Sequence, residues 1–310
     1  MTDEPTQVIS INFESGGSGK GVSWHMDAAS CPLRRALRDL ARKRAEANGL
    51  PQEHNWGGME KADRGSIFHK LVELYHTGWL RPEQALEIPC PDAKSAFDEG
   101  IRFFTGYRDN FPQDFWGKVL GAEVKLPRDQ DLKALEIPDA LIEAPPYILP
   151  VTIDLIIEVT NEDVARIVKT LPVLEGMEAG VYLVDWKTKD QKPYNLLNAY
   201  GGKVQGLTYQ AVYNFCNPDA PCKGMIYMGI VGHKPMRLRD EGQRKPKSFW
   251  PLLQHSPTDD DLQMLGSFFL SAEALSHTNF PNLSSCEDFG SCVYYIDGER
   301  TCLQKAKALE

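Results

Sequence analysis

Two apolar stretches decide the fold that this sequence predicts: VTIDLIIEV at residues 151–159 and GVYLVDWKT at residues 180–188. Both are rich in β-branched and aromatic residues, which favour strands. Asp154 interrupts the first run, and Asp185 and Lys187 stand two residues apart in the second. Because side chains alternate across a strand, Asp185 and Lys187 are expected to share one face of the sheet.

The sequence on either side of these runs predicts further strands and several helices. Apolar periodicity and helix-ending residues favour helices at 27–48, 64–77, 93–110, 193–216 and 258–276. Shorter apolar runs favour strands at 6–13, 117–126 and 223–232. This order indicates an α/β fold, in which the N- and C-terminal parts form a helical, cysteine-bearing cap.

Composition places the chain among globular proteins and excludes one class of nucleic-acid binder. Hydrophobic residues make up 42% of the 310 residues and charged residues 25%. The net charge of −9 excludes a binder that relies on overall charge alone, because such proteins are basic. No secretory signal and no apolar run of membrane-spanning length is visible, so we expect a cytoplasmic protein without a membrane partner.

Two local basic runs stand out against the acidic total, at residues 34–44 and 233–247. They are read either as solvated faces or as flanks of a cleft that receives DNA. Phe249 and Trp250 end the second run, where stacking on bases is one reading and core packing is the favoured one.

The acidic residues and the lysine of the two central runs carry the chemistry. Carboxylates at the ends of buried strands are costly unless they bind something, and a divalent cation meets that cost. Oxygen ligands suit magnesium or manganese. The alternative is a surface hairpin in which Lys187 forms a solvated salt bridge with Asp154 or Asp185.

The arrangement resembles the PD-(D/E)XK nuclease superfamily, and within it the RecB-like nucleases. In that family one strand supplies an aspartate, matched here by Asp154, and the next supplies Asp/Glu-x-Lys, matched by residues 185–187. The upstream helical histidine of the family is matched by His69. Glu123 falls where relatives often carry a glutamate near the site. Relatives usually have a glycine shortly before the first aspartate, and this chain does not.

The resemblance implies a role for each matched residue. Lys187 would position the attacking water. Gln205 and Tyr209 match the Gln-x-x-x-Tyr motif and share one helix face, where amphipathic packing is the other reading. A lone helical histidine such as His69 would otherwise be an ordinary packed residue. The implied metal ligands are the side chains of His69, Asp154 and Asp185 and the main-chain carbonyl of Trp186.

Four of the seven cysteines match a further feature of a subset of RecB-like nucleases. That subset includes the CRISPR-associated RecB-like exonucleases and many phage nucleases, and it holds a [4Fe–4S] cluster with one cysteine before the nuclease core and three after it. The matching residues are Cys31, Cys286, Cys292 and Cys302. Four thiolates also suit tetrahedral zinc, and four unconnected thiols remain the other reading. Cys90, Cys216 and Cys222 are read as ordinary packed residues.

The resemblance implies a restriction-endonuclease-like core, a mixed central β-sheet flanked by helices. We expect an N-terminal strand and glycine loop at 1–24, a helical region at 25–117, the nuclease core at 118–256 and a cysteine-rich tail at 257–310. The implied activity is metal-dependent exonuclease cleavage at DNA ends or in single strands. The alternatives are a non-catalytic nucleic-acid-binding subunit of a recombination or repair complex, and a sequence-specific endonuclease.

Overall fold

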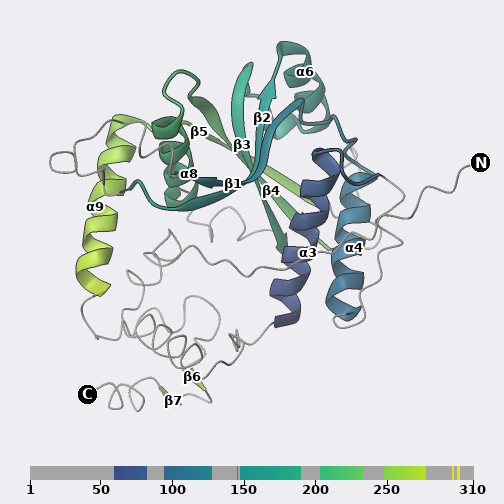
Figure 1. The fold of residues 1–310 in the computed structure, drawn as a ribbon, viewed down its shortest axis with the longest axis horizontal. Helices are drawn as coiled ribbons and strands as arrows, with labels where there is room; N and C mark the ends of the chain where they lie inside the picture. The colour runs from purple at the N-terminus through teal and green to yellow at the C-terminus, as the bar shows by residue number, and fades with distance from the viewer. Residues whose placement is uncertain are drawn as a thin grey trace, which may run out of the picture.

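A five-stranded mixed sheet forms the centre of the molecule (Figure 1). The computed structural model describes residues 59–81, 94–127, 145, 147–189, 203–232, 248–276, 295–296 and 299–300. The sheet has the order β1-β2-β3-β4-β5, and its strands are β1 (Lys118–Leu126), β2 (Val151–Val159), β3 (Gly180–Lys189), β4 (Cys222–Val231) and β5 (Phe249–His255).

The five-stranded sheet contains one parallel pair, β3 and β4, and its other neighbouring strands are antiparallel. Strands β1, β2 and β3 are antiparallel neighbours, β3 and β4 are parallel, and β4 and β5 are antiparallel. The parallel pair needs a crossover connection, which contains helix α8 (Lys203–Cys216). Two short strands near the C-terminus, β6 (Tyr295–Ile296) and β7 (Glu299–Arg300), pair with each other.

Helices cover both faces of this sheet, as the α/β prediction required (Figure 1). One face carries α3 (Met59–His76) and α4 (Lys94–Arg108), which lie side by side, together with α6 (Asn161–Thr170) and the 3₁₀ turn η2 (Pro172–Leu174). The other face carries α8 and α9 (Asp259–Ser276).

Two buried clusters fill the space between the sheet and its helices. The cluster beneath α3 and α4 is rich in aromatic residues, and Phe68, Tyr107, Trp116 and Trp186 are fully buried in it. Burying a side chain of this size contributes about 1.5–3 kcal/mol each to folding. The cluster beneath α8 and α9 is mainly aliphatic, with Leu183 and Met225 facing Phe269 and its neighbours. The aromatic cluster is therefore the main anchor for α3.

Most elements expected from the sequence are present where the structure describes the chain. The predicted helices at 64–77, 93–110 and 258–276 correspond to α3, α4 and α9. The predicted strands at 117–126 and 223–232 and the two central runs correspond to β1, β4, β2 and β3. The predicted strand at 6–13, the helix at 27–48 and residues 193–202 of the helix at 193–216 lie outside the described residues.

Five elements have no counterpart in the sequence prediction: the short η2, β6 and β7, and the longer α6 and β5. Helix α6 is short and mostly polar, and a capping box between Thr160 and Asp163 starts it. Strand β5 contains Pro251, which argues against a central strand but is tolerated at a sheet edge, where β5 lies. Pro251 hides β5 from a prediction based on apolar pattern, whereas Val164, Ile167 and Val168 of α6 follow helical spacing and were overlooked.

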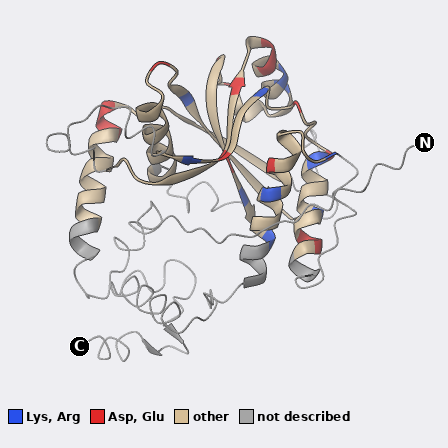
Figure 2. Cartoon of the chain, viewed as in Figure 1, with Lys and Arg blue, Asp and Glu red and all other residues tan. Residues whose placement is uncertain are grey.

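The described residues contain no helix long and apolar enough to cross a membrane. In Figure 2, the Lys and Arg residues of the described part are spread over several helices and strands and do not gather on one element. The basic runs at 34–44 and 233–247 lie outside the described residues.

Candidate metal centre

The sheet forks at the position where the sequence analysis expected the chemistry. Strands β2 and β3 pair from Leu155 opposite Val184 to Val159 opposite Gly180. Past the pair of Leu155 and Val184, the two strands separate. There β2 continues beside β1 only, and β3 continues beside β4. Asp154 and Asp185 are the first residues past the last pair, so both carboxylates lie at the mouth of the fork.

The carboxylate of Asp154 connects the two branches of the fork to helix α3. Its Oδ2 accepts a hydrogen bond of 2.9 Å from the backbone N–H of Trp186 on β3. The same oxygen lies 3.3 Å from Nδ1 of His69 on α3. Burial alone would raise the pKa of Asp154, but the charges of His69 and Lys187 and the bond from Trp186 outweigh it and lower this pKa. Asp154 is therefore a buried carboxylate that stays ionised.

His69 shows the matching shift. Burial favours its neutral form, but the attraction of Asp154 outweighs burial and raises its pKa above the ordinary value of 6.5. With no metal bound, the two side chains thus form an ion pair. A metal ligand must be a neutral imidazole, so binding a cation here would release the histidine proton.

Glu123 on β1 completes this group and has a strained backbone. Ala122 pairs with Leu155 and Val124 with Ile153, which places Glu123 opposite Asp154. Its φ of 48° lies in the left-handed region, which costs a residue other than glycine of order 1–3 kcal/mol. Burial, together with repulsion from Asp154, raises the pKa of Glu123 to about 7. A cation beside Glu123 would offset both the cost of burying its carboxylate and the repulsion from Asp154.

The ligand atoms of these three side chains fit one divalent cation. The donor atoms of His69, Glu123 and Asp154 all lie within 4.8 Å of one another. The two carboxylates suit magnesium or manganese, whereas the imidazole nitrogen is a donor more typical of transition metals, so of these two ions the set favours manganese. The trio shares His69 and Asp154 with the ligand set expected from the sequence, but the structure brings Glu123 into it where Asp185 was expected.

Asp185 and Lys187 form a buried pair beside the trio. Nζ of Lys187 donates to the Asp185 carboxylate at 2.8 Å, and the two side chains share a face as strand alternation predicts. Burial raises the pKa of Asp185 to about 6, although Lys187 opposes the shift. Burial disfavours the ammonium of Lys187, but the charges of Asp185 and Asp154 outweigh it and raise its pKa well above the usual range. Lys187 therefore keeps its proton.

Helix α8 brings a tyrosine and a glutamine to the same edge. Gln205 donates from Nε2 to the hydroxyl of Tyr209 at 2.9 Å, one helical turn away. Burial, reinforced by the charge of Asp185, raises the pKa of Tyr209 to about 12. The helix lies very close to the sheet at Gly206, where a Cβ atom would overlap Gln254 and Tyr227. The glycine between the two motif residues thus sets how near they come to the carboxylates.

Trp186 lies on the opposite face, between two histidines of α3. Its fully buried indole contacts the ring of His69 with centroids 6.4 Å apart and stacks on His76 at 6.1 Å. His69 and His76 are seven residues apart, which is two turns of one helix face. The sequence analysis did not single out His76, although this spacing is visible in the sequence.

The predicted cysteine site lies outside the described residues, because Cys31, Cys286, Cys292 and Cys302 all fall in the parts of the chain that are not described. Cys90 falls there too. Neither Cys216 nor Cys222 forms a disulfide with another described residue, and burial raises the pKa of Cys222 to about 12. An inert, protonated thiol at Cys222 agrees with its reading as a packed residue.

Comparison of the sequence with known protein families and with curated proteins gave no match.

Proposed function

We propose that the chain is a metal-dependent DNA nuclease with a restriction-endonuclease-like core of the PD-(D/E)XK, RecB-like type. The observation that carries the proposal is the convergence of the His69, Glu123 and Asp154 donors with the Asp185–Lys187 pair at the fork of β2 and β3. One ionisable group from α3 and one from β1 meet the three at the fork. Burying each of these five groups is costly unless a ligand binds there.

The geometry argues against the simpler reading of a solvated salt bridge. The side chain of Asp185 is 3% exposed and that of Lys187 is 19% exposed, so this pair is not a surface hairpin contact. A buried ion pair adds little net stability, because desolvation offsets the attraction. Its presence beside three further ionisable groups therefore points to a functional site.

Each residue of the site has its own role in the proposed reaction. A divalent cation held by His69, Glu123 and Asp154 supplies a Lewis acid for the phosphodiester when it is bound. Lys187 remains an ammonium, so it orients the attacking water and offsets negative charge that develops on the phosphoryl oxygens, and it does not act as a base. Tyr209 accepts a bond from Gln205, which leaves its own proton for a phosphate oxygen.

The substrate is DNA, cleaved at ends or in single strands, and the four-cysteine cluster remains part of the proposal. The net charge of −9 means that attraction to the phosphates must come from the metal and from the local basic runs. Iron and acid-labile sulfide analysis of anaerobically purified protein tests the cluster, with Cys31→Ala as the variant and Cys222→Ala as the control.

Cleavage of end-labelled DNA tests the activity. Purified protein is incubated with manganese or magnesium and with linear single-stranded, linear duplex and circular DNA. An exonuclease shortens the linear molecules and leaves the circles intact. Lys187→Ala and Asp185→Asn are expected to lower the rate by at least about 100-fold, the scale for removing one electrostatic contact to the transition state.

Lys118→Ala is the matched control, because Lys118 also pairs with an acid on this sheet, Glu158, at 2.9 Å but in an exposed position. It should cleave like the wild type. DNA binding without cleavage by the wild-type protein in either metal would contradict the proposal and favour a non-catalytic binding subunit. Cleavage of circles would favour an endonuclease.

A further inference from the structure

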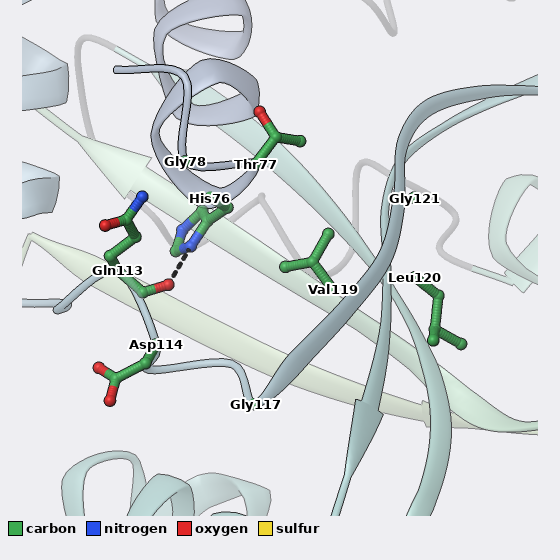
Figure 3. A pocket seen from close by; sticks show the side chains of 9 residues that line it. All are labelled: His76, Thr77, Gly78, Gln113, Asp114, Gly117, Val119, Leu120 and Gly121. Carbon is green, nitrogen blue, oxygen red and sulfur yellow. Dashed lines mark hydrogen bonds between the residues drawn. The ribbon is translucent and has the colours of Figure 1, made fainter. Parts of the chain in front are cut away.

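A hollow of about 770 Å³ lies next to the candidate metal centre and has no role in the chemistry proposed above. It is bounded by the end of α3, the turn before β1 and the first half of β1 (Figure 3). Val119 extends from β1 toward the end of α3, where the lining residues His76 and Thr77 lie. Pockets that receive small organic groups have volumes in this range.

The hollow exists because of local backbone features on both sides. The register of β1 against β2 shifts between Val119 and Gly121, so Leu120 is an extra residue that bends the strand. Gly78, Gly117 and Gly121 line the space and fill none of it with side chains. Gly78 and Gly117 have φ values of 80° and 78°, a backbone conformation that favours glycine.

The same two elements that form the hollow also form the metal centre. His69 and His76 lie on one face of α3, and seven residues of helix span about 10 Å. On β1, Gly121 precedes Glu123 by two residues, or about 6.6 Å of strand. The hollow and the cation site are thus two ends of one seam between α3 and β1.

The chemistry of the lining favours a neutral, planar group over a phosphate. Among the nine lining residues Asp114 is the one with a formal charge, and its side chain turns away from the hollow in Figure 3. No Lys or Arg lines the space. Both ring nitrogens of His76 already have partners, because Nδ1 bonds the backbone oxygen of Gln113 and Nε2 bonds the hydroxyl of Tyr107. A phosphate would find no positive partner here.

Exposed apolar side chains at the rim suit the face of a base. Leu120 lines the hollow and is 45% exposed, and Trp79, which follows the lining residue Gly78, is 72% exposed. An exposed apolar side chain at the edge of a hollow offers a surface that a flat ligand in the hollow can contact. Aromatic and apolar surfaces bind nucleobases by stacking, in a way that tolerates any sequence.

We propose that this hollow receives a nucleobase of the substrate strand, one to three nucleotides from the scissile phosphate. The proposal rests on the proposed nuclease function and names where that enzyme holds its substrate. The offset follows from the 10 Å between the two histidines, since a stacked strand advances about 3.4 Å per nucleotide and an extended strand advances further.

The test is cleavage of oligonucleotides that carry a single abasic site at successive positions from the cut, with manganese present. Wild-type protein should slow about tenfold when the abasic site reaches one fixed offset within three nucleotides, the cost of losing one stacked base. Thr77→Trp fills the hollow from an exposed position, and Leu120→Ala removes part of its rim. Both should slow cleavage of intact DNA and lose the dependence on offset. Val173→Ala, at another exposed apolar position, should behave like the wild type.

The outcomes separate this proposal from the nuclease proposal. Equal rates at all offsets in a protein that cleaves would overturn the base pocket alone. An offset dependence that persists in Thr77→Trp would place base recognition elsewhere and would also overturn it. If the wild type does not cleave, the same oligonucleotides labelled with 2-aminopurine are used for binding. Fluorescence quenching at one offset, absent in Thr77→Trp, would support the pocket without catalysis, and uniform fluorescence would overturn it.

Discussion

His69 and His76 lie two turns apart on the same face of α3 and contact the same tryptophan, yet their ionisation is opposite. Burial lowers the pKa of His76 to about 4. His69 is also desolvated, but Asp154 at 3.3 Å raises its pKa. The nearest partners of His76 are a carbonyl and a phenol, both neutral. The charge of the partner, not the degree of burial, therefore decides which histidine is charged.

The hydrogen bonds of His76 show a group built for packing. The carbonyl of Gln113 can only accept, so Nδ1 of His76 donates to it and Nε2 accepts from Tyr107. Trp116 in turn donates to the Tyr107 hydroxyl at 2.6 Å. Both nitrogens of the neutral His76 ring therefore have hydrogen-bond partners. His69 has an acid beside it, as a ligand requires, and its side chain is 24% exposed.

Removing the acid that distinguishes the two histidines should have the largest effect. In Asp154→Asn, the pKa of His69 is expected to fall toward that of His76, because burial remains and the main attraction is gone. Cleavage should fall at least about 100-fold, since one ligand charge is lost. Histidine titration by NMR measures the first effect and a cleavage assay the second. A His69 pKa that stays above 6.5 in this variant would contradict the ion pair.

Changing the histidines themselves should separate stability from activity. His76→Ala leaves a cavity and unpaired groups on Tyr107 and Gln113, and should cost about 4 kcal/mol of unfolding free energy. His69→Gln keeps a donor for Asp154 and should cost about 1 kcal/mol, while cleavage falls further than in folded His76→Ala protein. Urea unfolding should show the larger loss of stability in His76→Ala, and cleavage rates should show the larger loss of activity in His69→Gln. Equal stability losses would contradict the assigned roles.

The comparison also shows which features of the site are accessible from sequence. Asp154, Asp185 and Lys187 interrupt apolar strands. The cost of burying these side chains, and the expectation that they lie close together, follow from strand alternation and from the position of the two strands as neighbours. The entry of Glu123 into the ligand trio depends on a bulge and a positive φ in β1, which no residue pattern in KVLGAEVKL indicates. The hollow depends on that same bulge. The family resemblance placed Glu123 near the site, but the bulge and the positive φ that bring it into the trio were not predicted.

Glu123 offers a smaller effect that depends on pH. Its pKa of about 7 in the fold is above that of an unfolded glutamate, so it favours folding below about pH 4.5 and loses that contribution as pH rises through 7. In metal-free buffer, Glu123→Gln should therefore raise the melting temperature relative to the wild type at pH 8 and not at pH 4.5. Thermal unfolding with EDTA at both pH values measures this.

The exposed acid Glu158, paired with Lys118, gives the control for that experiment. Glu158→Gln should lack the gain at pH 8. Adding manganese at pH 8 should stabilise the wild type more than Glu123→Gln, because only the wild type offers the second carboxylate of the trio. A Glu123→Gln protein that is no more stable than wild type at pH 8 without metal would contradict the raised pKa of Glu123 that burial and Asp154 cause.

The smallest expected effect concerns Gly65, one turn before His69 on α3. An added Cβ would meet Thr188 Oγ1 at 3.5 Å, an ordinary contact, so the space tolerates alanine. Alanine also favours helix over glycine by up to about 1 kcal/mol, and Gly65→Ala should stabilise the fold by about that amount without changing cleavage. Gly100 on α4 is the matched control, because its Cβ would lie 2.5 Å from Cγ2 of Ile67, and Gly100→Ala should destabilise. Thermal unfolding decides between them. A destabilising Gly65→Ala would mean that α3 sits closer to β3 at the His69 end than the distances indicate, which would narrow the space for any cation held there.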